Sequence, residues 1–165
     1  MNKSCSDFIS WIENNGWNIT CKSETELKLN YNIVSRYKDI SQSYIEFLKR
    51  VKQCIAPSQK AWFLCEDEYN NNSEIAFKWN EFELLSLKAA ENNEKWKAEI
   101  ISWWDKYLPI VMSVNGGYSF YAIDLIDNIG SIVHGFEPEF EEAEKIANSV
   151  EEFFEMIMTN MIELI

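Results

Sequence analysis

The sequence predicts an α+β domain, in which helices from both ends of the chain wrap a mostly antiparallel sheet that includes a three-stranded meander in the C-terminal half. Two observations carry this prediction. Apolar residues recur with helical spacing near both ends and in two central segments, whereas after Pro109 they alternate with the strand period of two. A chain of 165 residues with 47% hydrophobic residues can bury one core, so residues 1–165 are expected to form a single folded domain.

The N-terminal third predicts one helix and one strand. Residues 6–15 are expected to form a short helix that ends at Gly16 and turns three apolar side chains inward: Phe8, Ile9 and Ile12. Apolar and polar residues alternate over 27–33, which is typical of a strand.

The next segment, "SQSYIEFLKRVKQC", predicts an amphipathic helix. Ser43 and Glu46 have the spacing of a capping box, in which each side chain satisfies an unpaired amide at the helix start. A single apolar stripe follows at helical spacing: Tyr44, Phe47, Leu48, Val51 and Ile55. The helix is expected to end before Pro57, and "KAWFLCEDEY" is expected to form a strand.

A second central helix is predicted ahead of Pro109, because proline disfavours helical geometry in the residue before it. Its stripe comprises Trp96, Ile100, Trp103 and Tyr107.

The meander follows. "PIVMSV" and "YSFYAIDL" flank Asn115 and Gly116, a pair that supplies the positive backbone dihedrals of a tight hairpin turn. The turn "IDNIG" then leads into a third strand, "SIVHGF".

The last segment predicts a closing helix. Ser149 and Glu152 repeat the capping-box spacing. The stripe behind them comprises Val150, Phe153, Phe154, Ile157 and Met161.

Composition narrows the classes of function. Polar residues interrupt the N-terminus and leave no apolar core of a secretory signal, so a cytoplasmic protein with reduced thiols is expected. Its cysteines are scattered and form no zinc-binding pair: Cys5, Cys21, Cys54 and Cys65. No EF-hand spacing and no glycine-rich phosphate loop occurs, so neither a metal nor a cofactor is expected.

Charge favours a basic protein partner. The formal net charge is -12, which disfavours binding to nucleic acid or to an anionic membrane. From Tyr107 onward the chain has eleven acidic residues and a single basic residue, Lys145, so the acidic charge is concentrated in the last third.

Two residues raise the question of catalysis. Asp124, at the end of the second meander strand, is either a catalytic carboxylate or an acceptor of backbone amides at a turn, and the second role is the more frequent one. His134 is the only histidine, and no nucleophile motif accompanies it. We therefore expect no catalytic residues.

Partner binding offers more candidates. The acidic run "FEPEFEEAEK" is either a solvated face or a docking surface, and the strong overall acidity supports docking. The candidate contact residues are Asp67, Glu68, Glu137, Glu139, Glu141 and Glu142, with Trp79 as an exposed aromatic anchor.

Several of these segments, in this order, resemble the SUKH superfamily, which includes fungal cell-wall assembly regulators and many bacterial immunity proteins. The matching segments are "ISQSYIEFL", "YLPIVMSVNGGYSFYAIDL", "NIGSIVHG" and "IANSVEEFFEMI", and the resemblance extends over roughly residues 36–158. Ser41 or Gln42 stands where the family usually has proline, and Val150 stands where phenylalanine is typical. The resemblance implies an α+β fold with a scaffolding role for Asp124.

The resemblance and the charge together predict an immunity protein that binds a cognate toxin domain, expected to be a basic nuclease, and neutralises it by occlusion without catalysis. The alternative from the same family is a non-enzymatic regulatory scaffold of the cell-wall assembly regulator type. A small hydrolase using Asp124 with another carboxylate is the third hypothesis, and no nucleophile or cofactor loop in the sequence supports it.

Overall fold

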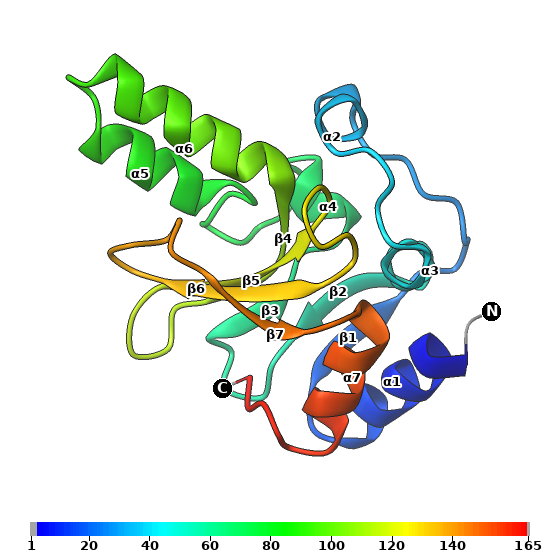
Figure 1. Cartoon of the computed structure of the whole chain (residues 1–165). Helices are drawn as coiled ribbons and strands as arrows, with labels where there is room; N and C mark the ends of the chain where they lie inside the picture. Colours follow the sequence, from blue (N-terminus) through cyan, green and yellow to red (C-terminus); the bar gives the residue numbers. More distant parts are fainter. Residues whose placement is uncertain (1–2, 165) are drawn as a thin grey trace.

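The computed structural model describes residues 3–164. Its sheet is antiparallel throughout and its seven strands lie side by side in chain order, from β1 at one edge to β7 at the other (Figure 1). The strands are β1 Asn18–Cys21, β2 Val51–Ile55, β3 Ala61–Phe63, β4 Tyr107–Ser113, β5 Ser119–Asp124, β6 Ile132–Phe136 and β7 Glu144–Ala147.

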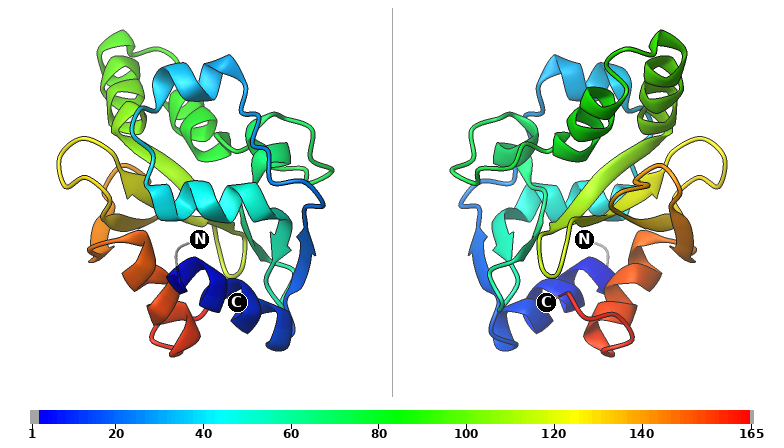
Figure 2. Two further views of the ribbon diagram at one scale, coloured as in Figure 1. Left: turned by 90° about the vertical axis from the view of Figure 1, so that its right-hand side faces the viewer. Right: turned by 90° about the vertical axis from the view of Figure 1, so that its left-hand side faces the viewer.

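Helices cover both faces of the sheet (Figures 1 and 2). They are α1 Lys3–Asn14, α2 Tyr31–Arg36, α3 Gln42–Arg50, α4 Glu66–Tyr69, α5 Glu81–Ala89, α6 Glu94–Lys106 and α7 Val150–Met158. Successive residues of β5 show the division. Phe120 packs on Trp104 of α6 with ring centroids 4.8 Å apart, and Tyr121 packs on Phe153 of α7 at 5.0 Å. Since neighbouring strand residues point to opposite faces, α6 and α7 lie on opposite sides of the sheet.

An aromatic cluster joins the helices of the α7 face. Phe8 of α1 stacks on Phe154 of α7 at 4.1 Å, and Phe47 of α3 packs on Phe63 of β3 at 5.1 Å. All four side chains are buried, so helices from both ends of the chain share one core, as the sequence predicted.

The C-terminal half follows the prediction closely. The meander is β4, β5 and β6. Its first turn differs from the predicted tight turn: residues 114–118 separate the two strands, and the positive φ values belong to Gly116 at +71° and Gly117 at +132°, whereas Asn115 does not have one. Ser149 caps α7 by accepting a hydrogen bond from Glu152 N at 3.0 Å, and the Glu152 carboxylate in turn accepts one from Asn148 N. Met161 departs from the prediction, because it lies beyond the end of α7 and is 74% exposed.

The strand predicted over residues 27–33 is wrong. Its second half forms α2, which buries Ile33, and its first half forms neither helix nor strand. Side chains of the α4 region bind the backbone of this first half, where a neighbouring strand was expected. Asn70 accepts a hydrogen bond from Asn30 N at 2.8 Å and donates one to Lys28 O at 2.7 Å. The actual edge strand, β1, lies earlier in the chain and was not predicted.

The helix predicted from Ser43 to Ile55 is shorter than expected. It ends at Arg50, because Val51 adopts extended backbone and begins β2. The predicted capping box is also wrong: the N-cap is Ser41, while Ser43 lies inside the helix and its hydroxyl donates to Glu151 of α7.

Two further boundaries differ. The predicted strand "KAWFLCEDEY" divides into β3 and the single turn α4. Helix α6 ends at Lys106 and passes directly into β4, so Pro109 lies within a strand, at a bulge. Trp96, predicted to lie on the buried stripe, is 44% exposed at the start of α6.

Candidate partner-binding surface

Asp124 organises a turn. Its Oδ1 accepts hydrogen bonds from Ile126 N and Asp127 N, both at 3.0 Å, and its Oδ2 accepts one from Asn128 N at 2.9 Å. The side chain is only 2% exposed, so its acceptor positions are directed at the backbone of the following loop. This geometry gives the carboxylate the structural role that the residue pattern favoured.

His134 packs as an aromatic ring of the sheet. It stacks on Tyr121 with centroids 4.4 Å apart and lies 5.8 Å from Phe136. Partial burial lowers its pKa, and the nearby Glu144 carboxylate opposes this effect. Burial of Tyr121 raises the pKa of its hydroxyl to about 12.

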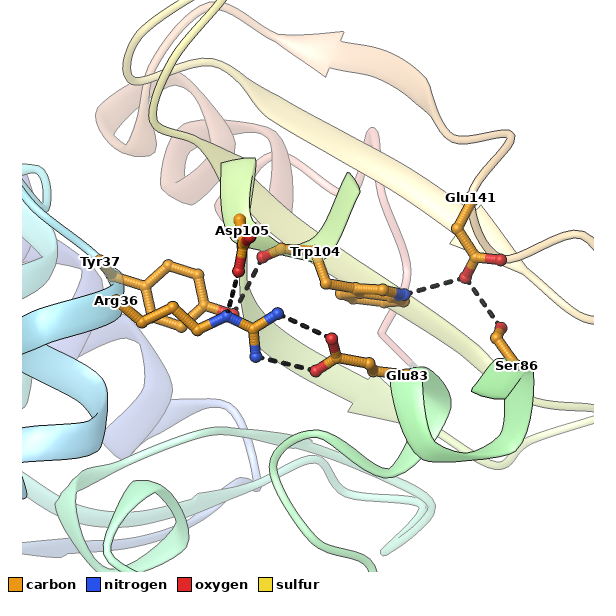
Figure 3. Close-up of polar contacts among 7 residues, drawn as sticks. All are labelled: Arg36, Tyr37, Glu83, Ser86, Trp104, Asp105 and Glu141. Atoms are coloured by element: carbon orange, nitrogen blue, oxygen red, sulfur yellow. Dashed lines mark hydrogen bonds and ion pairs between the residues drawn. The ribbon is translucent and has the colours of Figure 1, made fainter. Parts of the chain in front are cut away.

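The last turn of α6 connects three separate segments of the chain, and Figure 3 shows its contacts with Arg36 and Glu141. Trp104 Nε1 donates to Glu141 Oε2 at 2.9 Å, in the connection between β6 and β7. Asp105 accepts from Arg36 Nε of α2 at 2.7 Å, and Lys106 pairs with Asp127 of the β5–β6 loop at 3.4 Å. The last turn of α6 therefore contacts both loops as well as α2.

Arg36 also ties α2 to α5. Its two terminal nitrogens donate to the two carboxylate oxygens of Glu83 at 2.8 and 2.7 Å, a bidentate pair (Figure 3). Glu83 is 5% exposed, and the neighbouring Tyr37 hydroxyl donates to Trp104 O at 3.0 Å. Helices α2, α5 and α6 therefore form one connected unit above the sheet.

This unit holds an acidic surface segment, which we define as residues 137–144. Its five glutamates are Glu137, Glu139, Glu141, Glu142 and Glu144, and it contains no basic residue. Two of its residues anchor it. Phe140 is buried and stacks on Phe82 of α5 at 4.7 Å, and Glu141 Oε2 accepts hydrogen bonds from Ser86 Oγ and Trp104 Nε1 at 2.8 and 2.9 Å.

The anchoring leaves the remaining glutamates at the surface. Glu137, Glu139, Glu142 and Glu144 are exposed. Glu137 also accepts from Tyr118 N at 3.0 Å, and Glu142 N donates to Glu139 O at 3.0 Å in a turn. Partial burial raises the pKa of Glu141, whereas the hydrogen bonds from Ser86 and Trp104 oppose the rise.

Close packing around Gly135 of β6 also holds the acidic segment in place. A Cβ atom at Gly135 would lie 2.6 Å from the Phe120 ring and 2.8 Å from Phe140 O. Any side chain at position 135 would therefore displace the backbone that carries the acidic segment.

Two predicted contact residues are buried. Trp79 is 8% exposed and packs against Tyr37 and Tyr69, so the prediction of an exposed aromatic anchor is wrong. Glu68 is 5% exposed; its carboxylate accepts from Cys65 N at 2.8 Å and from Ser73 Oγ at 3.0 Å. Desolvation raises the pKa of Glu68, and these hydrogen bonds oppose the rise.

The predicted contact residues do not form one surface. Asp67 is half-buried and lines a hollow of about 580 Å³ beside β1 and β2, together with Thr20 and Lys52. The acidic segment connects β6 and β7, at the opposite edge of the sheet. Of the predicted set, the structure brings together Glu137, Glu139, Glu141 and Glu142.

Over residues 3–164, no group of three histidine, cysteine, aspartate or glutamate side chains is arranged to hold a metal ion. In the same described part of the chain, every helix is too short or too polar to cross a bilayer.

Sequence reasoning did not identify the residues that hold the acidic segment in place. No prediction covered α5, which supplies Phe82, Glu83 and Ser86. The available signal was a helix start in which Glu81 and Glu83 occupy the first turn.

Comparison with known proteins gives one match. The sequence model of the SMI1/KNR4 family (SUKH-1) matches residues 23–156, which is most of the chain. Searches of curated proteins and of solved structures found no match.

Proposed function

Because the chain belongs to the SMI1/KNR4 family (SUKH-1), we propose that it acts by binding another protein, as an immunity protein that neutralises a cognate toxin domain. The proposal places it in the cytoplasm, with a basic toxin as its partner. The toxin class that fits best is a nuclease, because an enzyme that binds phosphate backbones carries basic residues.

The observation that carries the proposal is the acidic segment. Four exposed glutamates lie within eight residues, on a backbone that Phe140 and Glu141 fix to α5 and α6. A fixed cluster of like charges produces a stronger local potential than the same charges scattered over the surface, and this potential attracts a basic surface. A segment that is already ordered also loses less conformational entropy when a partner binds.

The proposed mechanism is occlusion. The acidic segment steers the toxin, covers the basic surface that would meet nucleic acid, and leaves no room for the substrate. The chain supplies no catalytic group in this mechanism. Three backbone amides donate hydrogen bonds to the Asp124 carboxylate. This geometry supports binding without catalysis over a hydrolase that uses Asp124.

The test is a titration against the protein encoded by the gene immediately upstream, measuring binding and toxic activity at low and high salt. We expect tight binding that salt weakens, with loss of toxic activity. Reversing two exposed charges, Glu139→Lys with Glu142→Lys, should slow association at low salt by about tenfold.

The matched control is Glu24→Lys with Glu91→Lys, which changes net charge equally at two exposed positions outside the acidic segment. Equal effects of the two double variants would show that net charge matters and the segment does not. If the wild-type protein binds without reducing toxic activity, the regulatory scaffold becomes the better explanation.

A further inference from the structure

We propose that the β5–β6 loop is a second contact site for the same partner, and that two isoleucines at its tip insert into an apolar cleft with a basic rim. This inference rests on the proposed function and identifies the kind of surface that the toxin must present. We call residues 126–129 the isoleucine tip.

The isoleucine tip exposes two large apolar side chains. Ile126 is 58% exposed and Ile129 is 70% exposed, whereas most aliphatic residues of the sheet are buried in the core. Leu125, the residue before the tip, is 5% exposed, so the chain leaves the core and projects its next apolar side chains outward.

The loop that carries the tip is held at both ends. Besides the three amides bound by the Asp124 carboxylate, Gly130 N donates to Asp124 O at 2.8 Å and Asp124 N donates to Ser131 O at 2.9 Å. Leu125 N donates to Lys106 O at 2.8 Å, which joins the loop to the end of α6. Figure 2 shows the loop projecting from the body of the molecule beside that end of α6.

Rigidity and exposure together point to binding. Burial of an exposed apolar side chain by a partner is favourable, and a loop that is already ordered loses less conformational entropy on binding. A projecting apolar tip fits a concave surface, so the matching feature of the partner is a cleft.

Charge indicates the chemistry of the cleft's rim. Asp127 lies between the two isoleucines in sequence, and its ion pair with Lys106 is exposed, at 55% and 40% of the two side chains. Exposed pairs of this kind contribute little stability, so a cation of the partner can replace Lys106 at small cost. A basic rim also agrees with the net charge of -12.

The test measures affinity for the protein encoded by the upstream gene. Ile126→Ser with Ile129→Ser should weaken binding by roughly 100-fold, about tenfold for each buried isoleucine. Ile129→Ser is compared with Met161→Ser, since Met161 has a similar exposure of 74% on the segment that follows α7. The Met161 variant should bind as the wild type does.

Asp127→Asn tests the rim, and it should reduce the salt dependence of binding while leaving the fold intact. If the double isoleucine variant binds as tightly as the wild type, the proposed contact at the isoleucine tip is wrong. The proposed immunity function is not affected by that result. No binding by the wild type would overturn both. A wild-type homodimer that the double isoleucine variant dissociates would also overturn the inference, because the tip would then bind a second copy of this chain.

Discussion

Trp104 Nε1 donates a 2.9 Å hydrogen bond to Glu141 Oε2, and this contact joins the end of α6 to the acidic segment. The same oxygen accepts from Ser86 of α5, so one carboxylate connects two helices to a surface loop. Burial raises the pKa of Glu141, which makes the anchor sensitive to pH.

Glu141→Gln should remove one component of the pH dependence of stability. A carboxyl whose pKa is raised on folding stabilises the protein when protonated, and this contribution is lost as pH rises from about 4.3 through the raised pKa. The free energy of unfolding of the wild type, relative to E141Q, should therefore fall as pH increases over this window. Urea denaturation at several pH values measures the difference.

Arg36→Met should destabilise the protein strongly, because it leaves the buried Glu83 carboxylate without its bidentate partner. The expected loss is about 2–4 kcal/mol, and Arg36→Met with Glu83→Leu should recover much of it. Asp105→Asn is the control: its side chain is 52% exposed, so losing its contact with Arg36 should cost under about 1 kcal/mol. If the double variant is less stable than Arg36→Met, desolvation of Glu83 is not the cause.

His134→Phe should make stability less dependent on pH near neutrality. The pKa of His134 is lowered on folding, so the neutral ring stabilises the native state above about pH 6.5 and this contribution is lost as pH falls through the lowered pKa. Phenylalanine retains an aromatic ring opposite Tyr121 without titrating. The midpoint of urea unfolding should therefore fall less between pH 7 and pH 5 in H134F than in the wild type. Equal falls would contradict the prediction.

Asp124→Ala should cost about 3 kcal/mol, since three backbone amides lose their acceptor. Asp124→Asn retains one acceptor oxygen and should cost about half as much. Chemical denaturation measures both losses, and Asp127→Asn provides the reference for an exposed carboxylate of the same loop. If Asp124→Ala leaves the free energy of unfolding nearly unchanged, the structural role assigned to this residue is wrong.

Ser149→Ala should destabilise the protein by about 1 kcal/mol, because the hydroxyl caps α7 through the amide of Glu152. Ser41 occupies the same position before α3 but makes no side-chain cap hydrogen bond. Ser41→Ala should therefore have a smaller effect, and thermal unfolding of the two variants makes the comparison directly.

Features of the fold that depend on residues close together in the chain could be predicted from the sequence. The meander and the capped helix α7 both follow from residues a few positions apart, whose steric preferences and hydrogen bonds act locally. The resemblance to the SUKH superfamily, now shown by the family match, rests largely on the same segments.

Local patterns failed where a distant segment determined the outcome. The alternation over residues 27–33 resembles a strand, yet Asn70 and Glu66 bind its backbone and α2 takes its second half. Val51 and Ile55 continue a helical stripe, yet pairing with β1 draws them into a strand. A long-range hydrogen-bonding partner overrides a weak local preference.

Which acidic residues share a surface depends on how the chain packs in three dimensions. Glu68 and Glu139 look equivalent in the sequence, but one caps α4 inside the protein and the other lies in solvent. No spacing rule pairs Arg36 with Glu83 or Glu141 with Trp104, because these contacts exist only when α2, α5 and α6 assemble above the sheet. The burial of a charge depends on how segments far apart in the chain pack together. The local pattern of a single sequence does not encode that packing.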